Sequence, residues 1–303
     1  MKIQNWTPLK KGDLVDVVAP GARSEIEDLN KSLAILNSWG LRVRLQKGMN
    51  GKTPYYSNND EVRALGLWEA IRAKDSQAIW CLRGGYGCQR LLPFFKNKKP
   101  QPVKPFLGYS DITILHQFFS QNWGWQSLHA PVLDGLHEKT AKTKQLTKQV
   151  LFGEKSEFEF KGLKPLNSKA SSVNVNARLA GGNLKVITCM LGTDFSPSFK
   201  NKVIFFEDVH ERGYSLDRMF VQLQQSGSLK GVKGIVFGDF TGGIERDGKD
   251  HKNWALKSFA ESVPFPVWKG VKAGHNQVNY PLPIGGKVSL SKNQMTVFYG
   301  NNK

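Results

Sequence analysis

In the first half of the chain, short apolar segments typical of strands alternate with amphipathic segments typical of helices. Strands are predicted at residues 14–18, 41–45, 78–82, 104–107 and 127–129. Because parallel strands need a crossover connection, and a helix usually supplies it, this order predicts a parallel sheet with helices on both faces. We therefore expect an α/β fold whose N-terminal domain is Rossmann or flavodoxin-like.

Residues with strong capping preferences mark the predicted helix ends. Ser24 and Glu27 match a capping box ahead of the first helix, and Gly40 is expected to end that helix. The Asn and Asp residues at 58–60 offer three possible caps for the second helix. These signals support the helix predictions between the first three strands.

Two loops at the carboxyl ends of predicted strands carry the residues of most interest. Arg83-Gly84-Gly85-Tyr86-Gly87, the glycine loop, follows the third strand, and its glycines permit close approach of a ligand to the backbone. Gly108-Tyr109-Ser110 follows the fourth strand. Ligands of parallel sheets bind beyond the carboxyl ends of the strands, so we expect both loops to face one site.

Ser110 lies at the abrupt turn between a strand and a helix. The stretch resembles the G-x-S-x-G nucleophile elbow, although it lacks the second glycine. The helix after it would offer free N–H groups and a positive dipole end to an oxyanion. The same serine also suits the N-cap of that helix, so the local sequence leaves both roles open.

The second half of the chain has a different pattern. We expect an N-terminal domain at residues 1–155, a polar linker at 156–177 and a C-terminal domain at 178–303. Within the last part, strands are predicted at 203–206, 235–237, 288–290 and 296–299, and helices near 184–191, 216–223 and 254–259.

A serine nucleophile needs a base, and the base needs an acid that orients it. Glu207 and Asp208 follow an apolar strand, and His275 follows a glycine in a loop rich in Gly, Asn and Pro. Position alone does not choose between the two carboxylates, or between His275, His116 and His129. No H-E-x-x-H or C-x-x-C pattern occurs in the sequence, so we expect no metal site.

The formal net charge of +18 raises nucleic acid or a membrane surface as a partner. The lysines are dispersed, however, and the densest run, Lys96, Lys98 and Lys99, has no arginine-rich or aromatic motif beside it. A solvated basic surface or a basic cleft for a small acidic substrate explains the charge better. We expect neither nucleic acid nor membrane as a partner.

The cysteines and the chain start bear on the cellular compartment. Cys81, Cys88 and Cys189 are odd in number and lack metal-ligand spacing, which predicts reduced thiols. No apolar run approaches the roughly 18 residues of a membrane span. The polar residues 1–8 leave no place for a signal peptide, so a cytoplasmic location is expected.

Taken together, stretches along nearly the whole chain resemble the LD-carboxypeptidase family of serine peptidases, the muramoyltetrapeptide carboxypeptidases. The matching pieces, in family order, are residues 9–13, 17–20, 83–87, 104–113, 181–184, 206–209, 217–219, 234–240, 274–275 and 282–285. One such match would be weak evidence, but the ordered set is specific.

The resemblance implies a catalytic triad of Ser110, Glu207 and His275. Ser110 would attack the carbonyl carbon, His275 would transfer the proton, and Glu207 would orient the imidazole. It also implies an oxyanion hole formed by the backbone N–H groups of Asp111 and Gly85.

The resemblance also implies the substrate, the assembly and the shape. The substrate class is murein tetrapeptide, cut at the L,D-bond to terminal D-alanine during peptidoglycan recycling, without a cofactor. Arg83, Gly84 and Tyr86 are the expected substrate contacts, although a structural salt bridge would use Arg83 equally well. A smaller β-rich C-terminal domain and a homodimer are expected. Leu128 to Val132 replaces the usual His-Gly-Pro stretch on the substrate side.

Two other functions remain as alternatives at this point. A related serine hydrolase that cleaves peptidyl- or aminoacyl-nucleotide antibiotics, of the self-immunity type, would share the triad and need aromatic side chains to stack on a base. Trp123 and Trp125 are available, although core packing explains them more simply. A non-catalytic basic binding protein would show salt-dependent affinity for nucleic acid that Ser110→Ala leaves unchanged.

Overall fold

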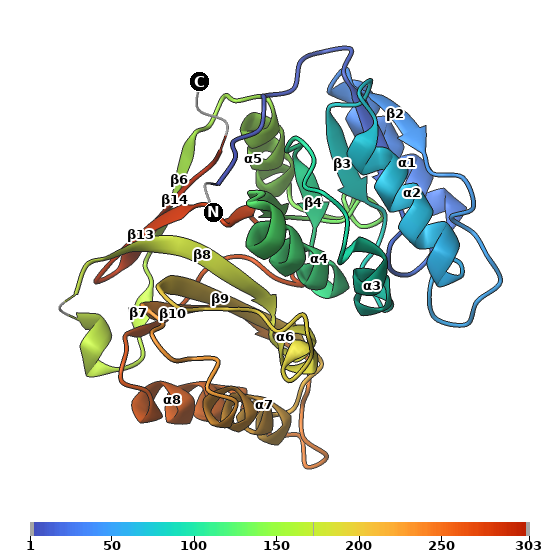
Figure 1. The fold of residues 1–303 in the computed structure, drawn as a ribbon. Helices are drawn as coiled ribbons and strands as arrows, with labels where there is room; N and C mark the ends of the chain where they lie inside the picture. Colours follow the sequence, from blue (N-terminus) through green and yellow to red (C-terminus); the bar gives the residue numbers. More distant parts are fainter. Residues whose placement is uncertain (1–2, 172, 301–303) are drawn as a thin grey trace.

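The computed structural model describes residues 3–171 and 173–300, which form two β-sheets flanked by helices (Figure 1). The first sheet has the strand order β12-β5-β4-β3-β1-β2. Its strands are β1 (Leu14–Val18), β2 (Arg42–Leu45), β3 (Ala78–Cys81), β4 (Phe106–Gly108), β5 (Ser127–His129) and β12 (Leu282–Ile284). Strands β1 to β5 are parallel, as predicted, and β12 joins β5 in antiparallel orientation.

Helices cover both faces of this sheet. They are α1 (Ile26–Ser38), α2 (Asp60–Arg72), α3 (Leu92–Phe95), α4 (Thr113–Phe118) and α5 (Ala141–Leu151). Successive side chains of a strand point to opposite faces. Val17 therefore packs in the cluster with residues of α1 and α5, and Val18 packs in the cluster with residues of α2, α3 and α4.

The second sheet has the order β6-β14-β13-β8-β9-β10-β11-β7. Its strands are β6 (Glu157–Lys161), β7 (Lys164–Pro165), β8 (Val175–Asn183), β9 (Lys202–Val209), β10 (Gly234–Thr241), β11 (Val267–Lys269), β13 (Lys287–Ser291) and β14 (Gln294–Phe298). The central strands β8 to β11 are parallel. Helices α7 (Gly213–Gln225) and α8 (Lys252–Ser262) cover one face, and α6 (Leu184–Met190) follows β8 (Figure 1).

The mixed α/β fold is confirmed, but residues 156–177 are more than a linker. This segment contains β6, which pairs with β14, and β7, which pairs with β11. Phe158 and Phe160 alternate with glutamates along β6, which is the two-residue period of a strand. The polar composition of the segment as a whole does not reveal this pattern. The prediction of a linker was wrong here because polar residues also occupy the exposed face of an edge strand.

Two helix starts also differ from the sequence prediction. Ser24 does not cap α1; its hydroxyl donates to Asp134, and Glu25 occupies the cap position without a side-chain bond. The second helix is capped by Asn59, whose Oδ1 accepts from the Val62 N–H at 2.9 Å. Tyr109, not Ser110, occupies the cap position of the 3₁₀ turn Ser110–Ile112, so Ser110 makes no capping bond.

Both sheets share one hydrophobic cluster, which includes Val17, Leu107, Phe205 and Val288. Strand β12 reinforces this connection, because it comes from the last part of the chain and completes the first sheet. Within the described residues, no helix combines the length and the apolar character needed to cross a membrane.

Candidate active site

Ser110 sits in a strained backbone conformation directly after β4. Its φ of +63° is left-handed, a region that side chains with a Cβ occupy at a cost of roughly 1–2 kcal/mol. Gly108 makes the turn possible, since a Cβ there would lie 2.8 Å from Cγ2 of Ile112. Strain of this kind at a strand-to-helix turn is the geometry of a nucleophile elbow.

The glycine loop after β3 lies against this serine. A Cβ added to Gly84 would stand 2.8 Å from Cβ of Ser110 and 3.2 Å from its Oγ, so only glycine fits. Gly85 has a φ of +87°, and its amide donates no hydrogen bond among the described residues. The loop thus brings a free backbone donor to the neighbourhood of the Ser110 hydroxyl.

The side chain of Asp111 joins these two loops. Its Oδ2 accepts a hydrogen bond of 2.8 Å from the backbone N–H of Cys88, just after the glycine loop. Burial raises the pKa of Asp111. Sequence reasoning assigned only the backbone of Asp111 and missed this contact, which depends on two segments meeting in space.

Glu207 and His275 form a close pair from two distant parts of the second half. Nδ1 of His275 donates to Oε2 of Glu207 at 2.6 Å. Glu207 is fully buried near the end of β9, and its Oε1 has no partner among the described residues. A carboxylate held in this way fixes the ring orientation and the tautomer of a histidine, leaving Nε2 as the basic nitrogen.

Tyr109 connects the Glu207–His275 pair to the turn that carries Ser110. Its ring packs on the imidazole of His275 with centroids 4.7 Å apart, and it directly precedes Ser110. Burial, then the nearby Glu207 carboxylate, raises the pKa of Tyr109 to about 12, so the phenol stays neutral. The structure therefore gathers Ser110, Glu207 and His275 around one tyrosine, from three separate parts of the sequence.

The neighbouring carboxylate Asp208 has a different task. It accepts hydrogen bonds from the Asn183 side chain at 3.1 Å and from the backbone N–H groups of Lys185 and Val209 at 2.9 and 2.8 Å. Burial, and then the Glu207 charge, raises the pKa of Asp208 to about 7. Asp208 thus braces the start of α6, and Glu207 is the carboxylate that contacts the imidazole.

The two other histidine candidates are structural. His116 is buried, with Nδ1 2.8 Å from Oγ of Ser127 and Nε2 2.9 Å from the Gly108 carbonyl oxygen, and burial lowers its pKa to about 4. His129 is buried between the rings of Tyr109 and Phe205. Burial lowers the pKa of His129 well below its usual value, so both rings stay neutral.

The predicted substrate contacts belong to the glycine loop, which meets Ser110 at Gly84. Arg83 keeps half of its side chain exposed, with one guanidinium nitrogen 3.4 Å from Oδ2 of Asp134. Tyr86 is 53% exposed and meets the ring of Tyr55 edge-on. Both predicted uses of Arg83, an internal ion pair and an accessible cation, are thus compatible with its placement.

Two charged residues near the pair were missed by sequence reasoning. Asp239 on β10 has a buried Oδ2 without a partner among the described residues, and burial raises its pKa to about 6. Lys139, before α5, is 8% exposed. The Gly-Asp after the predicted strand 235–237 was a signal for Asp239, but nothing in the sequence marked Lys139.

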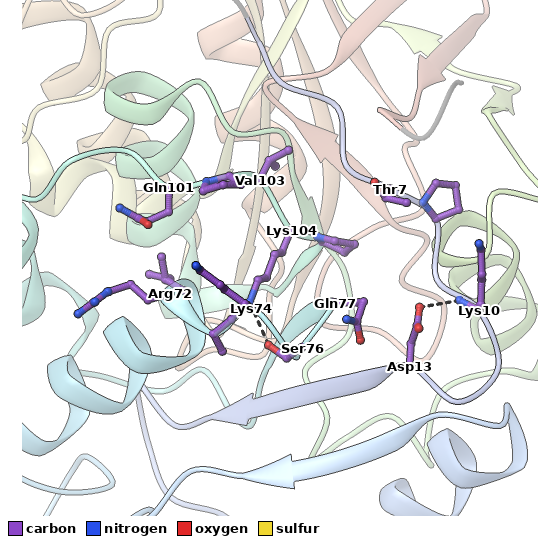
Figure 2. Close-up of a pocket in the computed structure, with 15 residues that line it drawn as sticks. Thr7, Lys10, Asp13, Arg72, Lys74, Ser76, Gln77, Gln101, Val103 and Lys104 are labelled. Carbon is purple, nitrogen blue, oxygen red and sulfur yellow. Dashed lines mark hydrogen bonds between the residues drawn. The ribbon is translucent and has the colours of Figure 1, made fainter.

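A hollow of about 510 Å³ at the opposite, amino end of the first sheet does not belong to this site (Figure 2). Lys104 points into it and donates from Nζ to the Ala70 carbonyl and to Oγ of Ser76, both at 2.9 Å. Its cation thereby stabilises the carboxyl end of α2. Among residues 3–171 and 173–300, no group of His, Cys, Asp and Glu is arranged to hold a metal ion.

Comparison with known proteins agrees with this geometry. The family model of the LD-carboxypeptidase N-terminal domain matches residues 15–130, and that of the C-terminal domain matches residues 176–290. A probable murein peptide carboxypeptidase from Bacillus subtilis is 33% identical over 96% of this chain and 93% of its own. The chain belongs to the LD-carboxypeptidase family. The predicted resemblance is confirmed.

Solved structures agree with membership of the LD-carboxypeptidase family. The muramoyltetrapeptide carboxypeptidase from Oxalobacter formigenes matches with a TM-score of 0.82 and 28% identity, over 94% of this chain and 99% of that one. The microcin C7 self-immunity protein MccF of Escherichia coli is 23% identical over 93% of this chain and 92% of its own. A solved MccF structure has a TM-score of 0.83 at 19% identity, over 97% of this chain and 98% of that one, which shows a shared fold.

As a member of the LD-carboxypeptidase family, the protein is a serine-type carboxypeptidase, a hydrolase. This classification sets aside the non-catalytic binding protein as an account of the chain.

Proposed function

We propose that this LD-carboxypeptidase hydrolyses the L,D-peptide bond to terminal D-alanine in murein tetrapeptide, as part of peptidoglycan recycling. One observation carries the proposal: His275, held 2.6 Å from the buried Glu207 carboxylate, packs on Tyr109 next to the strained Ser110. The names of the relatives from Bacillus subtilis and Oxalobacter formigenes support the substrate class.

The chemistry follows from the roles we assign to these residues. Oγ of Ser110 attacks the scissile carbonyl carbon, and Nε2 of His275 takes the hydroxyl proton while Glu207 stabilises the imidazolium. The oxyanion accepts hydrogen bonds from the N–H groups of Asp111 and Gly85. His275 then passes its proton to the amine of the departing D-alanine, and water hydrolyses the acyl-enzyme in a second cycle.

Substrate recognition is assigned to the rim of the site. Arg83 pairs with a carboxylate of the acidic peptide, which a guanidinium fork suits well. Gly84 leaves space beside Ser110, and Tyr86 offers an exposed ring to the peptide stem. None of these steps uses a cofactor or a metal.

The test is incubation of the purified protein with L-Ala-D-Glu-meso-diaminopimelyl-D-Ala, with released D-alanine measured by mass spectrometry. The parent should release D-alanine with or without a chelator. Ser110→Ala and His275→Ala should lose about 10³-fold or more in rate, and Glu207→Ala less. Full activity of Ser110→Ala would refute the mechanism, and an inactive parent would refute the substrate.

The similarity to MccF favours one other candidate, the cleavage of peptidyl- or aminoacyl-nucleotide antibiotics. A solved MccF structure holds glutamyl sulfamoyl guanosine. In this chain Trp123 and Trp125 are buried, so neither offers a face to a nucleobase. Hydrolysis of an aminoacyl sulfamoyl nucleotide but not of the tetrapeptide would support this candidate instead.

We further propose that the enzyme acts in the cytoplasm as a homodimer, which the family resemblance supports. Sedimentation of the purified protein would test the assembly, and fractionation of cells would test the location. A monomer at micromolar concentration would contradict the first proposal, and recovery outside the cytoplasmic fraction would contradict the second.

A further inference from the structure

The loop that carries His275 is tied to the first half of the chain by residues just before and within α5. Nζ of Lys139 donates to the Asn276 carbonyl at 2.8 Å, next to the histidine itself. The N–H of Thr140 donates to the Gln277 carbonyl at 3.2 Å. These bonds cross from one half of the chain to the other, and the segment 139–143 that makes them lies between the two ranges matched by the family models.

Two further bonds make the tie a continuous unit. The N–H of Asn279 donates to Oγ1 of Thr143 at 3.3 Å. The Oδ1 of the same Asn279 accepts from the Gly274 N–H at 3.2 Å. The backbone at Gly274 is closely packed against β9 and β10, because a Cβ there would be 3.0 Å from Cβ of Asp239 and 3.2 Å from Oε2 of Glu207. The position of His275 thus depends on residues of the first half.

Lys139 is unusual among these residues because its cation is buried without a carboxylate partner. The residue is 8% exposed, and no ion pair to Lys139 occurs in the described part of the chain. Its Nζ lies 5.6 Å from the centre of the Tyr109 ring, the same ring that packs on His275. Burying an unpaired ammonium is costly, so a neutral residue would be favoured if only packing mattered.

The charge of Lys139 faces the candidate catalytic pair. Burial lowers the pKa of Lys139, while the nearby carboxylates Glu138, Asp239 and Glu207 raise it. Glu207 and Asp239 lie on adjacent strands. The titratable groups around the imidazole and its tyrosine are Glu207, Asp239, Lys139, Tyr109, His129, Glu138, Arg83 and Asp134. Lys139 is the buried cation of this set, and its charge opposes the negative charge of the nearby carboxylates.

We propose that Lys139 is a positioning residue that holds the His275 loop in place across the two halves and places a buried positive charge beside the candidate catalytic pair. The inference rests on the proposed role of His275. Lys139 touches neither the substrate nor the reacting atoms; it acts through the Asn276 carbonyl, the Tyr109 ring and the two carboxylates.

The test compares Lys139→Met, Lys139→Gln and Lys139→Arg with Lys142→Met, which removes an exposed cation three residues along the same segment. Lys139→Met should lower kcat/KM by about 10- to 100-fold through misplacement of the base. It should also shift the acid limb of the pH profile of kcat/KM to higher pH by about one unit, because loss of the cation stabilises the imidazolium form of His275. Lys139→Gln should show the same shift of the acid limb. Lys139→Arg should have its acid limb at the same pH as the parent, and Lys142→Met should match the parent in both rate and pH profile.

A second measurement separates this inference from the proposed function. The titration of His275, followed by NMR of its ring carbon protons and assigned with His275→Ala, needs no substrate. The pKa of His275 should rise in Lys139→Met and Lys139→Gln only. The inference would be overturned if the His275 titration were the same in the parent and the Lys139 variants. It would also be overturned if Lys139→Arg lost as much activity as Lys139→Met and neither shifted the acid limb of the pH profile. If Lys139→Met fails to fold, the Gln and Arg variants answer the same question.

Discussion

At the scale of single residues, the site depends on places where the backbone leaves room for only one kind of side chain. Ser110 takes a left-handed φ of +63°, and Gly84 provides the space into which its Cβ projects. The prediction of Ser110 as a nucleophile came from the strand–turn–helix pattern around it. Its alternative role as an N-cap is excluded by the structure, because Tyr109 occupies that position.

Gly84→Ala should therefore damage the site more than the fold. The new Cβ would stand 2.8 Å from Cβ of Ser110, and a displacement of the serine by about 1 Å costs about 100-fold in kcat/KM. Thermal unfolding should shift only modestly. Gly135→Ala is the matched control, because a Cβ there has nothing within 4 Å. Parent-like activity of Gly84→Ala would show that this contact is unimportant.

At the scale of secondary-structure elements, helix α4 holds the two halves together beside the site. The side chain of Gln117 donates to the Gly181 carbonyl at 2.8 Å, and Oγ1 of Thr113 accepts from the Asn183 N–H at 3.0 Å. Gly182 allows this approach, since a Cβ there would lie 2.4 Å from Oγ1 of Thr113. The helix after the candidate nucleophile thus contacts the end of β8, beside the strand that carries Glu207.

Thr113→Val should weaken this contact without changing the volume of the side chain. It leaves the buried Asn183 N–H without a partner, which costs about 1–3 kcal/mol in the free energy of unfolding. Thr147→Val is the control: among the described residues its hydroxyl bonds only to the Thr143 carbonyl within α5, so a smaller loss is expected. Urea denaturation of both variants decides the point, and equal stabilities would contradict the importance of the α4 contact.

At the scale of the whole molecule, the two halves are not independent. Strand β12 of the last part completes the first sheet, β6 from the predicted linker pairs with β14, and one hydrophobic cluster spans both sheets. The expected boundaries at residues 155 and 178 therefore mark where the pattern of elements changes along the chain, while strands from both sides of them pair with each other in the first sheet. We propose that the halves depend on each other for stability.

Separate expression of residues 1–155 and 156–303 tests this dependence. Each fragment should lack a sharp cooperative thermal transition, because its share of the common cluster is exposed to water. Mixing the fragments should restore part of the transition monitored by circular dichroism. A fragment 1–155 that unfolds cooperatively by itself would show that the first half is an autonomous domain.

The sequence by itself determined the local elements and the family. Strands β1 to β5, most helices and the glycine and serine turns were predicted from apolar spacing and turn residues, because these features depend on neighbours a few residues apart. The edge strand β6, the cap of α1 and the bracing role of Asp208 were not, since each depends on a partner far along the chain. Only the tertiary structure brought Glu207 and His275 to Tyr109 and placed a buried Lys139 beside them, because such contacts exist only when both sheets pack on one core.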